Sequence, residues 1–374
     1  MLRTLFSGFD IPLFAAALLI SLFGLATMYS YVGGEEYFVR QVVWISVSTV
    51  FLIVASIPDY RLLRNGNTVF YFYLGILFLL ALILVIGEVT LGAQSRFDLG
   101  FFSFQPSDPA KLVLIMVLAK YFSKRHVEIG DLRHVIVSGI YAFLIFALVF
   151  VQPDFGSGII LASIWFGLVL VAGISWKHLG TVVILAGVVF SGLWLFGFEE
   201  YQKERIMTFL HPLADIRGAG YNAYQSTIAV GSGQLLGKGV GYGTQSKLQF
   251  LPEYETDFIF AAFAEEWGFV GVIFLFFLYG VVIMRTLRIS LRAETNFERI
   301  FGAGVAILFT SHFLVHIGMN IGLMPVTGTT VPFLSYGGSH LITEFLAIGI
   351  LMGMNKTPSE RRTRRVDETI LPTG

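Results

Sequence analysis

The sequence contains no cysteine, and only 13% of its 374 residues are charged. The lack of cysteine excludes disulfide bonds, thiolate nucleophiles and cysteine-ligated metal sites. The scarcity of charge excludes an ordinary water-soluble domain, in which about a quarter of the residues are charged. Because the 25 basic and 25 acidic residues balance, the net charge does not indicate a nucleic-acid partner, and we expect none.

Apolar side chains are abundant instead, at 55% of the chain, and there are 37 Phe and 40 Gly residues. A membrane-spanning helix needs about 20 mainly apolar residues. Such runs recur about ten times, which predicts an all-α integral membrane protein with spans at Ile11–Val32, Gln41–Ile57, Thr68–Ile86, Pro109–Phe122, Val135–Val151, Ser157–Ile174, His178–Phe196, Phe258–Met284, Ile300–Gly322 and Pro332–Met354. We expect residues 1–355 to form a single polytopic domain and residues 356–374 to form a disordered basic and polar tail.

The distribution of basic residues predicts the orientation in the membrane. Lys and Arg are enriched in cytoplasmic loops. Placing the N-terminus in the cytoplasm puts most Lys and Arg residues on the cytoplasmic side. Both termini are then cytoplasmic, and the long polar loop at about 199–256, between the seventh and eighth spans, is extracytoplasmic.

Asp108 and Lys111 begin the fourth predicted span and lie three residues apart, so they share a helix face. Ionisable residues at membrane depth are costly and often functional. A capped helix start with a local ion pair is an equally good explanation.

Asp257 lies where the long polar loop meets the eighth apolar run. Asp is a preferred N-cap, so a structural role is one interpretation. Glu265 and Glu266 follow within the same predicted helix, where capping does not explain them. Glu265 would lie about 80° around the helix from Asp257 and roughly 12 Å along it, too far for two carboxylates to share a proton. We therefore interpret Asp257 as the reactive carboxylate and Glu265 as a deeper supporting one.

The long loop is rich in glycine between residues 218 and 243 and carries several cations: Lys203, Arg205, Lys238 and Lys247. Glycines allow backbone amides to approach an anion such as pyrophosphate. A solvated loop is the alternative, although loops of this length are usually functional. Within it, Asn222–Val230 is a candidate interfacial helix.

His312 and His316 are one helical turn apart in the ninth predicted span. Two histidines at this spacing can bind a metal, but no carboxylate follows at ligand spacing. Hydrogen bonding or packing within the bundle is the better explanation.

Three stretches carry a resemblance to a known family. Gly322–Ser339, with the sequence GLMPVTGTTVPFLSYGGS, resembles the signature of the SEDS family of bacterial shape, elongation, division and sporulation proteins. Gln105-Pro106-Ser107-Asp108 with Lys111, and Gln152-Pro153-Asp154-Phe155-Gly156, resemble two further motifs of that family. The stretch from Gly243 to Ala261 is most similar to its rod-shape (RodA) branch. Asp108 stands where the family usually has Glu, and Thr329 and Thr330 replace more apolar residues.

The resemblance implies a peptidoglycan glycosyltransferase that polymerises lipid II into glycan strands during cell-wall elongation. It would act at the extracytoplasmic face of the bacterial cytoplasmic (inner) membrane as a multi-pass protein. Its implied partners are a class B penicillin-binding protein, which supplies the crosslinking transpeptidase, and other membrane proteins of the elongation complex. Asp257 matches the essential acidic residue of the family.

The reaction joins the 4-hydroxyl of one sugar to the anomeric carbon of another with inversion, and undecaprenyl pyrophosphate leaves. Asp257 is the candidate general base. The leaving pyrophosphate needs positive charge, for which the candidates are Arg96, Lys111, Arg205 and Lys247. Asp108, Asp154 and Glu265 are candidates to organise these cations. A divalent cation, Mg or Mn, is left open, and no metal ligands are predicted.

Two other functions are consistent with a polytopic membrane protein. A lipid II flippase or other transporter predicts charges along a path across the whole bilayer, whereas most charges here gather toward one face. A non-catalytic membrane scaffold of the wall-synthesis complex leaves Glu265, Glu266 and the placement of Asp257 unexplained.

Overall fold

The computed structural model describes residues 8–29, 34–60, 63–64, 66–90, 93–98, 100, 103–124, 132–211 and 220–355, so the predicted tail at 356–374 lies outside the described residues. The described chain is mainly helical, and each predicted span coincides with one helix. These helices are α2 (Ile11–Tyr29), α3 (Gly34–Ser56), α5 (Thr68–Ile86), α6 (Ser107–Ser123), α7 (Leu132–Val151), α8 (Phe155–Ala172), α9 (Trp176–Gly192), α13 (Ile259–Arg292), α14 (Asn296–Asn320) and α15 (Gly338–Met354).

Eight helices in the described ranges are long and apolar enough to cross a membrane. The two others that match predicted spans, α6 and α15, have 17 residues each. The chain is therefore a multi-pass helical membrane protein, and the number of ten crossings stays a prediction.

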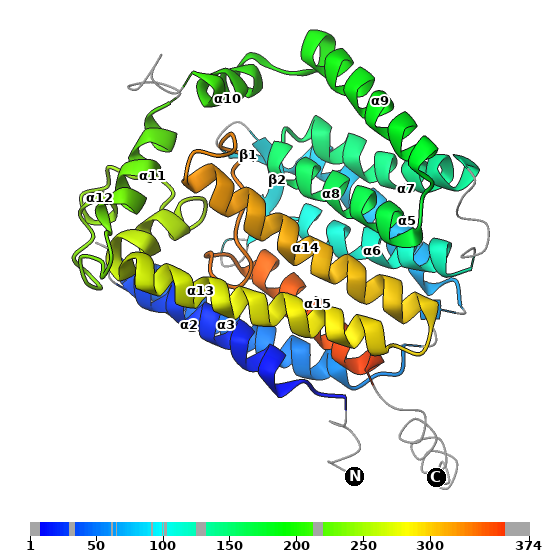
Figure 1. The fold of residues 1–374 in the computed structure, drawn as a ribbon, viewed down its shortest axis with the longest axis horizontal. Helices are drawn as coiled ribbons and strands as arrows, with labels where there is room; N and C mark the ends of the chain where they lie inside the picture. The colour runs from blue at the N-terminus through cyan, green and yellow to red at the C-terminus, as the bar shows by residue number, and fades with distance from the viewer. Residues whose placement is uncertain are drawn as a thin grey trace, which may run out of the picture.

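The helices form a bundle with α14 near its centre (Figure 1). α13 packs between α2 and α14, α3 packs along α15, and α14 also contacts α6 and α8. Among the eight long apolar helices, α14 is the most buried and α9 the least. The two ends of the described chain meet, because the Asn355 Nδ2 donates to the Gly8 carbonyl at 3.2 Å.

Three predicted helix boundaries were wrong. α3 begins at Gly34 rather than Gln41, and the acidic side chains of its first turn suit a helix N-terminus. α13 continues past Met284 to Arg292. α15 begins at Gly338 rather than Pro332, because the preceding residues form turns in which Phe333 has a φ of 65°.

A small antiparallel sheet lies between α5 and α6 and was not predicted. Its strands are β1 (Glu88–Thr90), β2 (Ala93–Asp98) and β3 (Ser103–Phe104), in the order β1-β2-β3. Phe97 pairs with Phe104 across β2 and β3. The sheet places Arg96 on its central strand.

The predicted loop at 199–256 contains short helices in its described part: α10 (Glu200–Leu210), α11 (Tyr221–Ser232) and α12 (Thr244–Lys247). A π-helical turn, η1 (Leu193–Gly197), precedes them. α11 confirms the predicted helix at Asn222–Val230, and its Ser226 hydroxyl donates to the Asn320 carbonyl at 2.9 Å. α11 thus packs on the end of α14, as well as against α13.

Candidate functional site

Asp257 lies near the end of a series of turns that continues to Phe258, directly before α13. The N-cap position of α13 is Phe258 and no side chain caps the helix, so the interpretation of Asp257 as an N-cap was wrong. The Asp257 carbonyl accepts a hydrogen bond from the Asn320 Nδ2 at 3.0 Å. A Cβ atom on Gly328 would lie 3.3 Å from the Asp257 Oδ2. The carboxylate therefore faces the backbone of the loop that follows α14.

The electrostatic environment of Asp257 sets it apart from an ordinary surface carboxylate. Burial raises the pKa of Asp257 to about 7, and the negative charge of Glu253 adds to the increase. The positive charges of Arg96 and Arg205 act in the opposite direction. Two of the predicted cations, one from β2 and one from α10, thus act on the predicted base. A carboxyl group with a pKa near 7 is well matched to general base catalysis at neutral pH.

Hydrogen bonds join the Asp257 segment to the stretch before α15. The Tyr336 N–H donates to the Glu255 carbonyl at 2.9 Å, and the Ser335 hydroxyl donates to the Thr256 carbonyl at 3.0 Å. Burial raises the pKa of the Glu255 side chain. The signature stretch thereby lies directly against the candidate base.

The two histidines of α14 form hydrogen bonds to the loop between α14 and α15. His312 Nδ1 lies 3.0 Å from the Thr330 carbonyl oxygen, and His316 Nδ1 lies 2.7 Å from that of Thr329. Because a carbonyl only accepts, Nδ1 carries the hydrogen in both rings. The expected role in bundle hydrogen bonding is confirmed for both residues.

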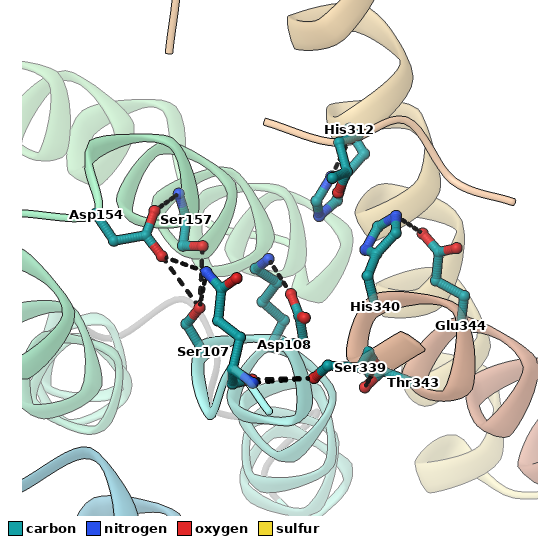
Figure 2. Close-up of polar contacts among 12 residues, drawn as sticks. Ser107, Asp108, Asp154, Ser157, His312, Ser339, His340, Thr343 and Glu344 are labelled. Carbon is teal, nitrogen blue, oxygen red and sulfur yellow. Dashed lines mark hydrogen bonds and ion pairs between the residues drawn. The ribbon is translucent and has the colours of Figure 1, made fainter. Parts of the chain in front are cut away.

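Asp108 and Lys111 form the predicted ion pair, with 3.1 Å between Oδ1 and Nζ, and both side chains are buried (Figure 2). The N-cap position of α6 is Pro106, so the predicted capping role of Asp108 was wrong. The charges of this pair act on His340 in α15.

His340 and Glu344 form a second buried pair that sequence reasoning missed, with 2.9 Å between Nε2 and Oε1 (Figure 2). The other oxygen of Glu344 accepts from the Phe333 N–H at 2.8 Å and so holds the turn before α15. The signal was present, since Glu344 is an ionisable residue in an apolar run, four residues after His340.

Asp154 caps α8 and connects the motif that begins at Gln152 with the motif that begins at Gln105. Its Oδ1 accepts from the Ser157 N–H at 3.0 Å, and its Oδ2 accepts from the Gln105 Nε2 at 2.9 Å and the Ser107 hydroxyl at 3.1 Å. The Gln105 Oε1 accepts in turn from the Arg96 Nε at 3.3 Å. Asp154 thus reaches Arg96 through Gln105. Figure 2 labels Asp154 together with its partners Ser107 and Ser157.

Glu265 is completely buried and binds the glycine-rich loop. Its Oε1 lies 2.6 Å from the Lys238 Nζ and accepts from the Thr244 N–H at 2.9 Å, and its Oε2 accepts from the Gln245 N–H at 3.1 Å. Two amides directly after the glycine-rich stretch therefore bind a carboxylate of the protein itself.

Glu266 and Lys247 also take part in holding this loop. The Glu266 Oε1 accepts from the Gly241 N–H at 3.0 Å. The exposed Lys247 donates from Nζ to the Gly241 carbonyl at 3.3 Å. The largest charge effects on Asp257 come from Glu253, Arg96, Arg205 and Glu255, and the cation paired with Glu265 is Lys238.

Two features bear on ligands. Between α8, α14 and the following loop is an apolar cavity of about 240 Å³, lined by residues that include Ile159, Leu314, Met324 and Thr327. Across the described ranges of the chain, no group of three or more His, Asp or Glu side chains is arranged to hold a metal ion.

We expect Lys111→Met to destabilise the protein by about 3 kcal/mol, because it leaves the Asp108 carboxylate buried without its cation. Unfolding of the purified protein in detergent measures this loss. The double variant Asp108→Asn, Lys111→Met should recover much of the stability, since no uncompensated charge remains. Equal losses in the single and double variants would show that the pair is not coupled.

Comparison with known proteins places the chain and its fold in one family. The sequence profile of the FtsW, RodA and SpoVE family, described as cell cycle protein, matches residues 6–360. The peptidoglycan glycosyltransferase MrdB of Escherichia coli (strain K12) is 40% identical over 317 residues, which cover 84% of this chain and 85% of that protein. Stage V sporulation protein E of Bacillus subtilis (strain 168) is 33% identical, covering 93% of this chain and 97% of that protein.

Solved structures show the same fold. A chain from a structure concerning the coordination of polymerization and crosslinking by a peptidoglycan synthase complex matches with a TM-score of 0.79 and 29% identity, covering 92% of this chain and 97% of that one. The Thermus thermophilus rod shape determining protein RodA matches with a TM-score of 0.70 and 26% identity, covering 92% of this chain and 96% of that one.

Proposed function

The chain belongs to the FtsW, RodA and SpoVE family of cell cycle proteins, and from this premise we propose that it polymerises lipid II with Asp257 as the general base. Relatives that span most of its length are named peptidoglycan glycosyltransferase, and the chain is an enzyme of that class. The observation that carries the assignment of the base is the Asp257 carboxylate facing the Gly328 backbone, with a pKa that burial raises to about 7 and that is subject to the charges of Arg96 and Arg205.

The reaction is a single displacement at the anomeric carbon of the donor sugar. The 4-hydroxyl oxygen of the acceptor forms the new glycosidic bond while the bond from that carbon to the pyrophosphate oxygen breaks. The hydroxyl proton passes to the Asp257 carboxylate, and the electron pair leaves with undecaprenyl pyrophosphate. Attack on the face opposite the leaving group inverts the anomeric configuration.

Arg96 and Arg205 are the proposed ligands of the leaving pyrophosphate. Arginine presents a planar fork of donors that matches phosphate oxygens. Both guanidinium groups hold the pKa of Asp257 down in the free protein. Pyrophosphate bound between them would neutralise their charge, so the pKa of Asp257 would rise and the carboxylate would become a stronger base.

The remaining predicted residues have supporting roles in this proposal. Lys111 is buried and paired with Asp108, so it stabilises the bundle beside His340 rather than contacting the substrate. Asp154 orients Gln105 and through it Arg96. Glu265 fixes the glycine-rich loop. The apolar cavity beside Thr327 adjoins the Gly328 backbone and could receive part of a lipid tail.

The proposed setting is the bacterial cytoplasmic membrane, with Asp257 on its extracytoplasmic side. Lipid II as the substrate and a class B penicillin-binding protein as the partner are part of the proposal, as are other membrane proteins of the elongation complex. The likeness to a chain of a peptidoglycan synthase complex supports a partner of that kind.

The dependence of the polymerisation rate on pH tests the role of Asp257. A base must be deprotonated to accept a proton, so we expect kcat/KM to fall as pH drops through about 7, the pKa of Asp257 in the free protein. Initial rates of lipid II polymerisation between pH 5 and 9 provide the profile.

Two variants that each remove one charge should move the inflection of the pH profile in opposite directions. Glu253→Gln removes a negative charge that raises the pKa of Asp257, so the inflection should move to lower pH. Arg96→Gln removes a positive charge that lowers it, so the inflection should move to higher pH. An inflection that stays in place in both variants would assign the titration to another group.

A further inference from the structure

α13 is interrupted at Gly268, which has a φ of 66° and a ψ of −170°. Only glycine adopts this conformation readily. The interruption frees two carbonyls on its N-terminal side, and both are bound by amides of the glycine-rich loop. The Lys238 N–H donates to the Glu265 carbonyl at 2.9 Å, and the Gly239 N–H donates to the Glu266 carbonyl at 3.0 Å.

Two amides on the other side of the interruption are bound by the same loop. The Phe269 N–H donates to the Gln234 carbonyl at 2.9 Å, and the Val270 N–H donates to the Leu235 carbonyl at 3.1 Å. Main-chain groups of the loop therefore form the hydrogen bonds that these four helix groups would otherwise make with one another across Gly268.

The contact between loop and helix is made by main chain. A Cβ atom on Gly233 would lie 2.0 Å from the Ala264 carbonyl oxygen, and one on Gly237 would lie 2.1 Å from that of Glu266. No side chain fits between the two segments. The turn Gly233–Leu236 is closed by a bond of 2.8 Å from the Gly237 N–H to the Gly233 carbonyl, so its apex has a fixed position on α13.

At that apex two apolar side chains are largely exposed, next to the exposed side chain of Gln234. Leu235 is 67% exposed and Leu236 is 80% exposed. They adjoin Phe269 and Val270, each 56% exposed, which begin an exposed apolar stripe on α13 that continues through Ile273, Phe274 and Phe277. On a membrane-spanning helix, such a stripe faces lipid.

The depth of the apex follows from the length of a membrane span. Arg285 marks the end of the apolar run of α13, and about 20 residues cross the hydrocarbon core. Counting back from Arg285 places the other boundary of the core near Glu265. Phe269 and Val270 then lie just inside the hydrocarbon edge, and the turn bonded to them lies at the same depth.

We propose that the turn Gly233–Leu236 inserts into the bilayer beside α13, with the Leu235 and Leu236 side chains covered by phospholipid acyl chains. Irregular backbone at this depth is tolerated only when its polar groups are satisfied by the protein. The bonds to α13 provide this for the Gln234 and Leu235 carbonyls. The insertion is independent of the proposed catalytic role.

The absence of native cysteine allows a direct test, because one introduced cysteine carries a single nitroxide label. The full chain bearing Leu236→Cys is labelled and reconstituted alone, at low protein-to-lipid ratio, in phosphatidylethanolamine and phosphatidylglycerol vesicles. Collision rates of the label with oxygen, which partitions into lipid, and with a water-soluble nickel complex report its surroundings. Phe277→Cys, on the exposed stripe of α13, is the lipid reference, and Gln249→Cys, exposed later in the same loop, is the water reference.

We expect the ratio of oxygen to nickel collisions at position 236 to exceed that at position 249 by about fivefold or more, and to lie below that at position 277, because the apex is near the hydrocarbon edge. Leu235→Cys gives an independent second position. A ratio equal to that at position 249 for both labels would overturn the proposal. Low collision rates with both reagents that depend on protein density would mean that a second copy of the chain covers the turn, which would also overturn it.

Discussion

Asp257→Asn should reduce the rate of lipid II polymerisation by about 10²–10⁴-fold, the contribution of a positioned general base. Asparagine keeps the size of the side chain and its place beside Gly328 but cannot accept the hydroxyl proton. Rates measured on one purified preparation of each protein, at a pH above 8, provide the comparison.

The loss should come without destabilisation. The pKa of Asp257 is raised from the ordinary 3.8 to about 7 in the folded protein, so its ionisation costs folding free energy that grows as pH rises between these two values and is complete above about 7. Asparagine removes that cost, and the midpoint of thermal unfolding at pH 8 should stay unchanged or rise. Glu253→Gln is the matched control, since it removes a neighbouring carboxylate and should retain polymerisation at high pH. A folded Asp257→Asn variant with the wild-type rate would exclude the general-base role.

The second large effect is expected for Glu265→Ala, which should destabilise the protein by about 3 kcal/mol or more. The substitution removes the acceptor of the Thr244 and Gln245 amides and leaves the Lys238 ammonium without its partner. Unfolding in detergent measures the loss, and faster proteolysis of the glycine-rich loop should accompany it.

Lys238→Met is the control for this second prediction. The Lys238 side chain is 31% exposed, and the carboxylate it leaves behind keeps its bonds to backbone amides. Its effect should therefore be clearly smaller than that of Glu265→Ala. Equal effects would mean that the ion pair, rather than the hydrogen bonds from the Thr244 and Gln245 amides, provides the stabilisation.

The helical spans could be predicted from the sequence because each depends on local composition. An apolar run long enough to cross a bilayer forms a helix whatever its neighbours are, as the coincidence of Thr68–Ile86 with α5 illustrates. Helix ends were less predictable where turn geometry depends on distant groups. Pro332 suggested a first helical residue, yet the Glu344 carboxylate holds the Phe333 amide in a turn and delays α15 to Gly338.

The arrangement around the candidate base could be predicted only in part. Asp257, Arg96 and Arg205 were named as candidates from the sequence, but they come from the turns before α13, the sheet and α10, and no spacing along one helix brings them together. Glu265 was expected to organise cations near Asp257, whereas it binds loop amides 20 and 21 residues earlier in the chain. The interruption of α13 at Gly268 makes this possible, and a glycine within an apolar run does not by itself predict that a loop will join the helix.

Polymerisation of lipid II by the purified full-length chain, with its class B penicillin-binding protein partner present and transpeptidation blocked, tests the central claim most directly. We expect glycan strands together with one undecaprenyl pyrophosphate released for each new glycosidic bond, and loss of both products in Asp257→Asn. Movement of intact lipid II across the bilayer by the folded wild-type protein, without either product, would contradict it.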